Sequence, residues 1–337
     1  MGHAVRCYEA LGSWSLTNLI RNEGDRAIAA IDEFRQAYPE LDVRFYELEG
    51  NITELMTEEL KSADIIIFHE WNDPKLVAAV LSLRPALGFR VLFHDTHHRA
   101  YTDPGALLKM QLHLFDGVLA YGEVIRKIYS ERLGIAKTWT MHEAADVRHF
   151  YPRARGQSSD VLWMGNWGDE ERTQELYEFL FEPAKSLPDF KFVAYGVRYP
   201  ESARQALRDT GVCYRGYLPN LHAPAAYAES AVALHIPRRH YSNGLSGIPT
   251  IRMFEAMACG APLLCSPWMD VEGLFAAGED YIAVADGEAM KRELLCLLRD
   301  PLRRQQMGQS AVERIRQRHT CAHRAEQLTA ICQELLQ

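Results

Sequence analysis

The sequence predicts an α/β protein with two Rossmann-like domains that face each other across a cleft. Its 337 residues are too many for one comfortable hydrophobic core and about right for two ordinary domains. Short apolar runs alternate with amphipathic stretches in both halves, a pattern typical of doubly wound sheets with crossover helices. The polar segment 153–160 separates the two halves and predicts a linker.

In the first half, each apolar run is too short for a helix and is rich in Val, Ile, Phe and Tyr. Between these runs, residues 24–38 and 74–83 place apolar side chains at helical spacing and predict crossover helices. The predicted strands are residues 4–9, 42–48, 64–69, 90–94 and 117–121.

The second half begins the same alternation again after the linker. Its predicted strands are residues 161–164, 191–195, 212–214, 231–236, 262–266 and 281–284, and its predicted helices are residues 171–180, 203–210, 221–230, 252–258 and 287–298. We therefore expect domains at 1–152 and 161–315. A C-terminal helix at 316–337 is expected to pack back on the first domain.

Charge and composition exclude several classes of protein. The net charge of −8 and the pI of about 5.9 argue against a surface built to hold nucleic acid, so we expect a small-molecule partner. No apolar run approaches the roughly 20 residues of a membrane span. The first residues do not resemble a secretion signal, which predicts a cytoplasmic location. The seven cysteines have no zinc-type spacing and are expected to be reduced thiols.

The residues that follow each predicted strand are the candidate site, because ligands of open α/β sheets bind beyond the carboxyl ends of the strands. After strand 161–164 come a turn with Gly165 and Asn166 and a helix start with Arg172. Glycine permits close approach to the backbone, and helix N-terminal amides suit a phosphate. An ordinary strand-to-helix turn is the alternative. No GxGxxG or GxxxxGK[ST] motif lies nearby, which argues against a dinucleotide dehydrogenase and a P-loop protein.

Residues 242–262 are the most informative segment of the chain. A loop of small residues, including Ser246 and Gly247, precedes a short helix that carries Arg252 and Glu255. A carboxylate early in a helix can bind a ribose diol while loop amides bind phosphate or sugar hydroxyls. The alternative is a surface glutamate that caps the helix.

The sequence FEAMACGAP at 254–262 resembles the donor-binding helix of GT-B-fold retaining glycosyltransferases. Its wider context is most similar to the CgeB-like spore-maturation glycosyltransferases, over about residues 121–284. The resemblance implies a GT-B fold in which the second domain binds a nucleotide sugar, UDP- or another NDP-sugar. It also implies that the first domain binds the acceptor and that transfer proceeds with retention.

The resemblance implies roles for single residues. Glu255 matches the second Glu of the family's paired-Glu motif and would hold the donor ribose, while Arg172 matches the basic residue that stabilises the leaving diphosphate. Tyr217 lies in a loop that resembles the one flanking the nucleobase. The first Glu of the motif falls at Gly247, so sugar recognition there is expected to use the backbone amides of residues 246–248.

His94, Asp95, His97 and His98 cluster at the end of strand 90–94. Such side chains can ligate a metal, but their spacing matches no helical pair of the HExxH type and the chain has no Asp-x-Asp, so neither a metal nor another cofactor is expected. The resemblance implies instead that His97 or His98 faces the donor sugar or diphosphate, with Asp95 orienting it or acting on the acceptor hydroxyl. Capping of the next helix by Asp95 or Thr96 is the alternative.

Candidate acceptor residues follow the first and third predicted strands. They are Gly12 and Trp14 after the first, and His69 and Trp71 after the third. By strand order both pairs lie on the rim of the first domain. The tryptophans are suited to stack on a sugar ring, and packing in the core is the alternative.

Together these patterns predict metal-independent glycosyl transfer, in which Arg172, loop amides and a helix N-terminus meet the charge of the leaving group. Because no carboxylate pair suits a double displacement, a same-face mechanism assisted by the leaving phosphate is expected. A nucleotide-sugar epimerase that uses Asp95, His97 and His98 as acid/base groups, and a binding protein without turnover, stay open. The acceptor stays open between a small molecule, a polysaccharide, a protein and modified DNA, the polymers being held by the arginine-rich tail.

Overall fold

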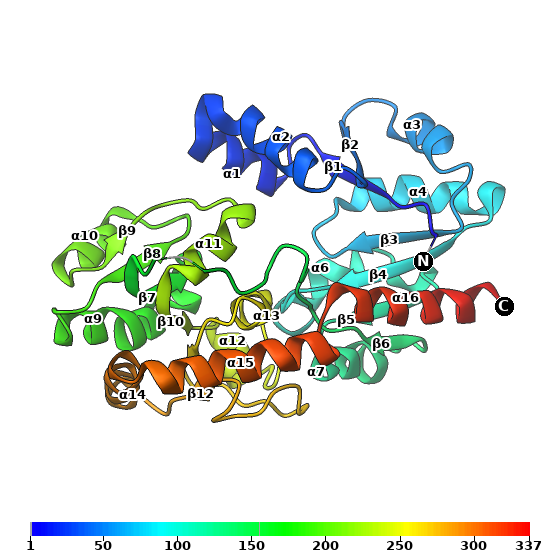
Figure 1. Cartoon of the computed structure of the whole chain (residues 1–337). Coiled ribbons are helices and arrows are strands. Elements are labelled where there is room, and N and C mark those ends of the chain that lie inside the picture. The colour runs from blue at the N-terminus through cyan, green and yellow to red at the C-terminus, as the bar shows by residue number, and fades with distance from the viewer. Residues whose placement is uncertain (1, 155) are drawn as a thin grey trace.

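The computed structural model describes residues 2–154 and 156–337, which form two α/β halves (Figure 1). Among these residues, the N-terminal half has a two-stranded and a four-stranded sheet, and the C-terminal half has a six-stranded sheet. The strand pairs are parallel throughout. Parallel sheets need cover on both faces, and the helices between the strands supply it.

The strands are arranged as follows. The first sheet pairs β1 (Arg6–Ala10) with β2 (Asp42–Tyr46), and the second has the order β3 (Ile65–His69), β4 (Arg90–Asp95), β5 (Gly117–Ala120) and β6 (Thr138–Thr140). The C-terminal sheet has the order β12 (Ile282–Ala283), β11 (Leu263–Cys265), β10 (Ser230–His235), β7 (Ser159–Met164), β8 (Phe192–Tyr195) and β9 (Cys213–Tyr214).

The helices of the N-terminal half are α1 (Trp14–Glu23), η1 (Gly24–Arg26), α2 (Ala27–Ala37), α3 (Ile52–Glu59), α4 (Pro74–Leu87), α5 (Arg99–Thr102), α6 (Pro104–Leu108), η2 (Leu112–Leu114), α7 (Glu123–Lys127) and η3 (Ile128–Arg132). Those of the C-terminal half are η4 (Asp169–Glu171), α8 (Thr173–Leu176), η5 (Tyr177–Phe181), α9 (Glu182–Ser186), α10 (Glu201–Asp209), η6 (Asn220–His222), α11 (Ala223–Ala228), α12 (Arg239–Asn243), α13 (Ile251–Ala258), α14 (Gly287–Arg299), α15 (Pro301–Arg318) and α16 (Cys321–Leu336). Among the described residues, no helix is long and apolar enough to cross a membrane.

Helix α4 shows how local sequence sets the element boundaries. The Asp73 side chain accepts a hydrogen bond from the Lys75 amide, and Pro74 occupies the first turn, where its missing N–H costs nothing. The helix ends at Gly88, which has the left-handed conformation (φ 79°) that glycine adopts readily. Val77 and Val80 lie on its buried face against the sheet, so burial of apolar surface holds the helix in place.

The two halves are in direct contact. Tyr241, Leu245 and Ile248 come from the C-terminal half but belong to the buried core of the N-terminal half. A Cβ at Gly122 would lie 2.6 Å from Ile248 Cγ1, so only glycine permits this approach. The Tyr121 hydroxyl also donates a hydrogen bond to the Tyr241 hydroxyl, at 2.7 Å. The residues that follow β5 and the segment 241–248 therefore form a tight contact between the halves.

The last two helices form a band that runs from the C-terminal sheet back to the N-terminal sheet (Figure 1). Ile331 and Leu335 of α16 share a buried cluster with Leu92 of β4 and Leu119 of β5. The Gln327 amide donates to the carbonyl oxygen of a β6 residue at 2.7 Å. Helix α16 is thus part of the core beneath β4–β6.

Each predicted strand is present, with its ends shifted by one or two residues. Strand β6 is absent from the prediction because it has three residues, two of them threonines, and lacks an apolar run. The predicted helix 171–180 is wrong as a single helix, because Arg172 has a non-helical φ of −143° and divides η4 from α8. Within the described residues, no ladder joins β1–β2 to β3, so the first half is not one continuous sheet.

Candidate functional site

Residues at the carboxyl ends of strands from the two halves meet between them. His98, which follows β4, lies 3.5 Å from the carboxylate of Glu171, which follows β7. Strand β7 is flanked by β10 on one side and β8 on the other, so the crevice at the ends of β7 and β10 is a topological switch point. Open α/β sheets bind their ligands at such points.

Buried polar atoms without a hydrogen-bond partner concentrate at the same place. Among the described residues, such atoms belong to nine side chains, and seven of these end or follow β3, β4, β7 or β10. The seven are His69, Glu70, His97, His98, Arg99, Arg172 and His235. Buried polar groups normally have partners, so this concentration indicates a ligand site. Six of the seven are histidines or arginines, which favours an anionic or strongly polar ligand.

The turn after β7 holds Arg172 against the backbone. Its Nη1 donates to the Asn166 carbonyl oxygen at 3.1 Å, and the guanidinium lies 5.3 Å from the centre of a Trp163 ring. A Cβ at Gly165 would lie 2.4 Å from Trp163 and 3.0 Å from Arg172, so glycine is required here. Burial lowers the pKa of Arg172 to about 10, which still leaves it charged at neutral pH. The turn thus presents a positive charge at the switch point.

Glu255 on α13 forms a closed triangle with two neighbours. Arg252 Nη1 donates to Glu255 Oε2 at 2.6 Å and to Asn220 Oδ1 at 3.0 Å, while Asn220 Nδ2 donates to Glu255 Oε1 at 3.1 Å. The Glu255 side chain is buried, so these contacts fix its position. Burial and the charge of Glu255 raise the pKa of Glu143 to about 7. Glu143 was not predicted from the sequence.

The conformation of the loop before α13 explains why position 247 is a glycine and not a glutamate. Gly247 has a φ of +90°, and a Cβ there would lie 2.2 Å from Val271 Cγ2. A glutamate at this position would be strained and would clash, whereas the half-buried Ser246 beside it is compatible with the loop. Tyr217, after β9, is also half-buried, and burial followed by the charge of Glu23 raises its pKa.

On the N-terminal side, Asp95 is fully buried and both its oxygens have protein partners. Oδ2 accepts from the Tyr129 hydroxyl at 2.7 Å and Oδ1 from the His97 amide at 2.9 Å. Burial raises the pKa of Asp95 to about 6 and lowers that of His97 to about 3. Asp95 therefore positions the backbone that carries His97.

Three residues that sequence analysis missed surround His98. Glu171 lies between the halves: its Oε2 accepts from Arg238 Nη1 at 2.6 Å, and its Oε1 lies 3.6 Å from His240 Nε2. Arg238 follows β10 and could have been found by the same rule that singled out Arg172. Burial lowers the pKa of His98 to about 4, so its imidazole is neutral at physiological pH.

An aromatic stack lies at the ends of β3 and β4. The ring of Trp71 stacks on His69 at 4.3 Å and 5°, and His69 lies 4.9 Å from His94, its neighbour in the sheet. Trp71 is 59% exposed, so much of the indole is open to solvent. Burial lowers the pKa of His69 to about 4 and of His94 to about 3, so both are neutral.

The other two acceptor candidates belong to a different part of the structure. Gly12 and Trp14 follow β1, which lies in the separate two-stranded sheet, and both are exposed. Among the described contacts, no ring pair joins Trp14 to the aromatic stack of Trp71, His69 and His94.

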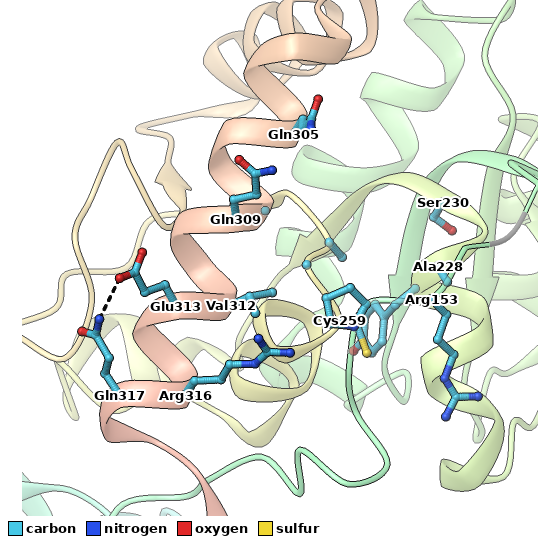
Figure 2. Close-up of a pocket in the computed structure, with 15 residues that line it drawn as sticks. Arg153, Ala228, Ser230, Cys259, Gln305, Gln309, Val312, Glu313, Arg316 and Gln317 are labelled. Atoms are coloured by element: carbon cyan, nitrogen blue, oxygen red, sulfur yellow. Dashed lines mark hydrogen bonds between the residues drawn. The ribbon is translucent and has the colours of Figure 1, made fainter.

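A groove of about 630 Å³ lies elsewhere, between α15 and the start of β10 (Figure 2). It is lined by Ser230, Gly260 and residues of α15, at the amino edge of the C-terminal sheet and away from the switch point. Arg316 points into this groove. The other tail arginines make protein contacts and are Arg303, Arg304, Arg314, Arg318 and Arg324.

Comparison with known proteins gives one family match by sequence. Residues 172–330 match a family model described as glycosyl transferase-like. No curated protein matches the chain by sequence.

Several solved structures share the fold across both halves. HepE from Anabaena, in complex with UDP, has a TM-score of 0.68 at 11% identity, covering 98% of this chain and 100% of its own. Sucrose-phosphate synthase from Thermosynechococcus elongatus has a TM-score of 0.65 at 15% identity, covering 88% of this chain and 84% of its own. T4 phage BGT, in complex with its UDP-glucose substrate, has a TM-score of 0.62 at 14% identity, covering 98% of this chain and 97% of its own. The predicted GT-B fold is confirmed.

Proposed function

We propose that this protein transfers a glycosyl group from a nucleoside-diphosphate sugar to an acceptor hydroxyl. The observation that carries the proposal is the group of buried, unpartnered nitrogens of His97, Arg99, Arg172 and His235 at the ends of β4, β7 and β10. These donors suit a diphosphate and a sugar, and the match of residues 172–330 to a glycosyl transferase-like model supports this assignment.

The donor would bind mainly on the C-terminal half. Glu255 is held in place by Arg252 and Asn220, and each of its two oxygens keeps a second lone pair that can accept a ribose hydroxyl. The backbone of Gly165 and Asn166 and the amides of residues 246–248 would contact the phosphates and the sugar, with Tyr217 against the base. UDP in HepE and UDP-glucose in T4 phage BGT support a uridine nucleotide as the first donor to test.

Arg172 would stabilise the diphosphate as it leaves. The bond between the anomeric carbon and the diphosphate oxygen breaks while the acceptor oxygen bonds to the same carbon, and the acceptor proton passes to a phosphate oxygen. Because Arg172 is buried and already positioned, its charge acts in a site of low polarity. This arrangement supplies the charge that a metal would otherwise supply, so we propose that transfer is metal-independent.

We further propose that the sugar is transferred with retention on the same face. A double displacement needs a carboxylate nucleophile at the anomeric carbon. Among the described residues after β3 and β4, the carboxyl of Asp95 is bonded through both oxygens and that of Glu70 is fully buried, which supports the same-face route.

A thermal-shift panel tests the proposal most directly. A ligand that binds only the folded state raises the melting temperature, so we expect UDP or another nucleoside diphosphate, and its sugar, to raise Tm. No shift with any nucleoside diphosphate would contradict the proposal. Conversion of a bound nucleotide sugar to its epimer without acceptor would assign an epimerase instead, and nuclear magnetic resonance of the transferred sugar would test retention.

A further inference from the structure

We propose that His98, Glu171 and His240 form a binding site for a divalent cation of the zinc type between the two halves of the protein. His98 follows β4 in the N-terminal half, Glu171 ends η4, and His240 lies on α12. The three side chains offer one ligand atom each, and these atoms all lie within 4.8 Å of one another. The site goes beyond the proposed function, because Arg172 already supplies charge for the leaving diphosphate.

The distances suit a small coordination sphere. His98 Nε2 lies 3.5 Å from Glu171 Oε2, and His240 Nε2 lies 3.6 Å from Glu171 Oε1. Ligands that bind a tetrahedral ion at about 2.0–2.1 Å lie about 3.4 Å apart. Small side-chain rotations would therefore bring the three ligand atoms around one ion.

The hydrogen bonds of His98 determine which ring nitrogen carries the lone pair. The Thr102 hydroxyl donates to the His98 carbonyl oxygen at 3.2 Å, so it accepts from His98 Nδ1 at 2.9 Å. Nε2 is then the unprotonated nitrogen. It is buried, has no hydrogen-bond partner and faces the carboxylate of Glu171. A cation beside the Nε2 lone pair and the Glu171 carboxylate would satisfy both groups.

The surroundings also resemble those of bound metals. Ligating histidines usually donate their second N–H to a nearby oxygen, as His98 does to Thr102. Ligating carboxylates are commonly hydrogen-bonded through their other oxygen, as Glu171 Oε2 is to Arg238 at 2.6 Å. That contact leaves Oε1 for an ion beside His240.

The ligand set and its neighbours define the chemical class of the ion. Two imidazoles and one carboxylate suit Zn²⁺, Co²⁺ or Ni²⁺, whereas Mg²⁺ and Ca²⁺ prefer sites made of oxygen. The positive charges of Arg238 and Arg99 lie close enough to disfavour protonation of His98, and they would also weaken a purely electrostatic cation site. We therefore expect selective binding of ions that imidazole binds strongly.

Cobalt spectroscopy on the full-length protein tests the site without any nucleotide. The protein is first freed of metal by chelation. One equivalent of CoCl₂ should then give the visible absorption bands of nitrogen-ligated Co²⁺, and ZnCl₂ should remove these bands by displacing the cobalt. His240→Ala and Glu171→Gln should each abolish the bands. Because His240 is partly exposed, its substitution should leave the fold intact, which circular dichroism checks. Thr102→Val should weaken cobalt binding about 10–100-fold.

His222→Ala is the matched control. His222 Nε2 lies 2.9 Å from the Glu33 carboxylate and also joins the two halves, but it is not part of a three-ligand group among the described residues. This variant should keep the cobalt bands. Absence of bands in the wild-type protein at millimolar cobalt, or bands that survive both ligand substitutions, would overturn the proposal. Neither result bears on nucleotide binding, so the proposed function is tested separately.

Discussion

The candidate site has two walls, one made by residues of the C-terminal half and one by residues of the N-terminal half, and the two walls differ in charge. On the C-terminal wall, Arg172 stays charged despite its burial, Arg238 bonds to Glu171, and Glu255 forms an ion pair with Arg252. The N-terminal wall has one guanidinium, Arg99, and otherwise holds groups that burial drives toward their neutral forms, which are His69, Glu70, His94, Asp95, His97 and His98.

This contrast indicates how the two substrates would be divided. A wall of fixed charges suits a diphosphate, while neutral imidazoles and an exposed indole suit an uncharged acceptor. Residues 1–152 contain more Asp and Glu than Lys and Arg, which further disfavours a nucleic-acid acceptor. Each prediction below changes one wall and leaves the other intact.

Removal of the Arg172 charge from the C-terminal wall should have the largest effect on the rate of transfer. Arg172→Ala should lower kcat by about 10²–10³-fold and the affinity for the donor much less, because the charge matters most as the diphosphate leaves. Release of nucleoside diphosphate from the bound nucleotide sugar measures this. Arg208→Ala, which removes an exposed arginine of α10, should leave the rate unchanged. A loss of donor affinity as large as the loss of kcat would contradict the assigned role.

Substitution of Glu70 tests whether burial in the N-terminal wall keeps an ionisable side chain neutral. Burial and the charge of Asp95 raise the pKa of Glu70 to about 8 from an unfolded value near 4.5. The folded state therefore holds this proton more tightly, and the associated stability is present at low pH and lost as pH rises through about 8. Glu70→Gln should remove a pH-dependent component on the order of 2–4 kcal/mol from the free energy of unfolding.

Urea unfolding between pH 5 and pH 8 measures this component. The wild-type protein should lose stability relative to the Gln variant as the pH rises. Glu58→Gln, an exposed residue of α3, should follow the wild-type curve. Equal pH dependence of the wild type and Glu70→Gln would show that Glu70 is ionised in the folded protein.

A smaller effect is expected for Glu255. Glu255→Gln keeps the shape of the side chain but replaces charge-assisted hydrogen bonds to the ribose, each worth about 1.5–3 kcal/mol, by neutral ones. We expect the Kd for the nucleoside diphosphate to rise about 10-fold. Calorimetric titration measures it, with Glu313→Gln on α15 as the control. An unchanged Kd would contradict the proposed contact between Glu255 and the donor.

The smallest effect on the donor is expected for Trp71. Trp71→Ala should change the free energy of unfolding by no more than about 0.5 kcal/mol, because the side chain is largely exposed. The donor Kd should stay within about twofold, while the KM for an acceptor found in the release assay should rise several-fold with loss of stacking. A donor Kd that rises with the acceptor KM would contradict the division between the walls.

The sequence predicts the strands well because buried parallel strands need continuous apolar runs. It also singles out Arg172, which follows the carboxyl end of a predicted strand, and Glu255, which lies on a short helix after a loop of small residues. It does not predict the contact among His98, Glu171 and His240, because their separation along the chain contains no periodicity that links them. The absence of a glutamate at Gly247 is visible in the sequence, but its cause, contact with Val271, depends on the folded loop.

The chain crosses between the halves twice, and the two crossings are bonded to each other. The Ala145 amide donates to the His319 carbonyl oxygen and the Cys321 amide donates to the Ala145 carbonyl oxygen, both at 3.0 Å. Together with the packing of Ile248 against Gly122, these bonds join the halves to each other at more than one place. A slide of one half along the other would break these bonds, so they help to hold the two walls of the site in one alignment.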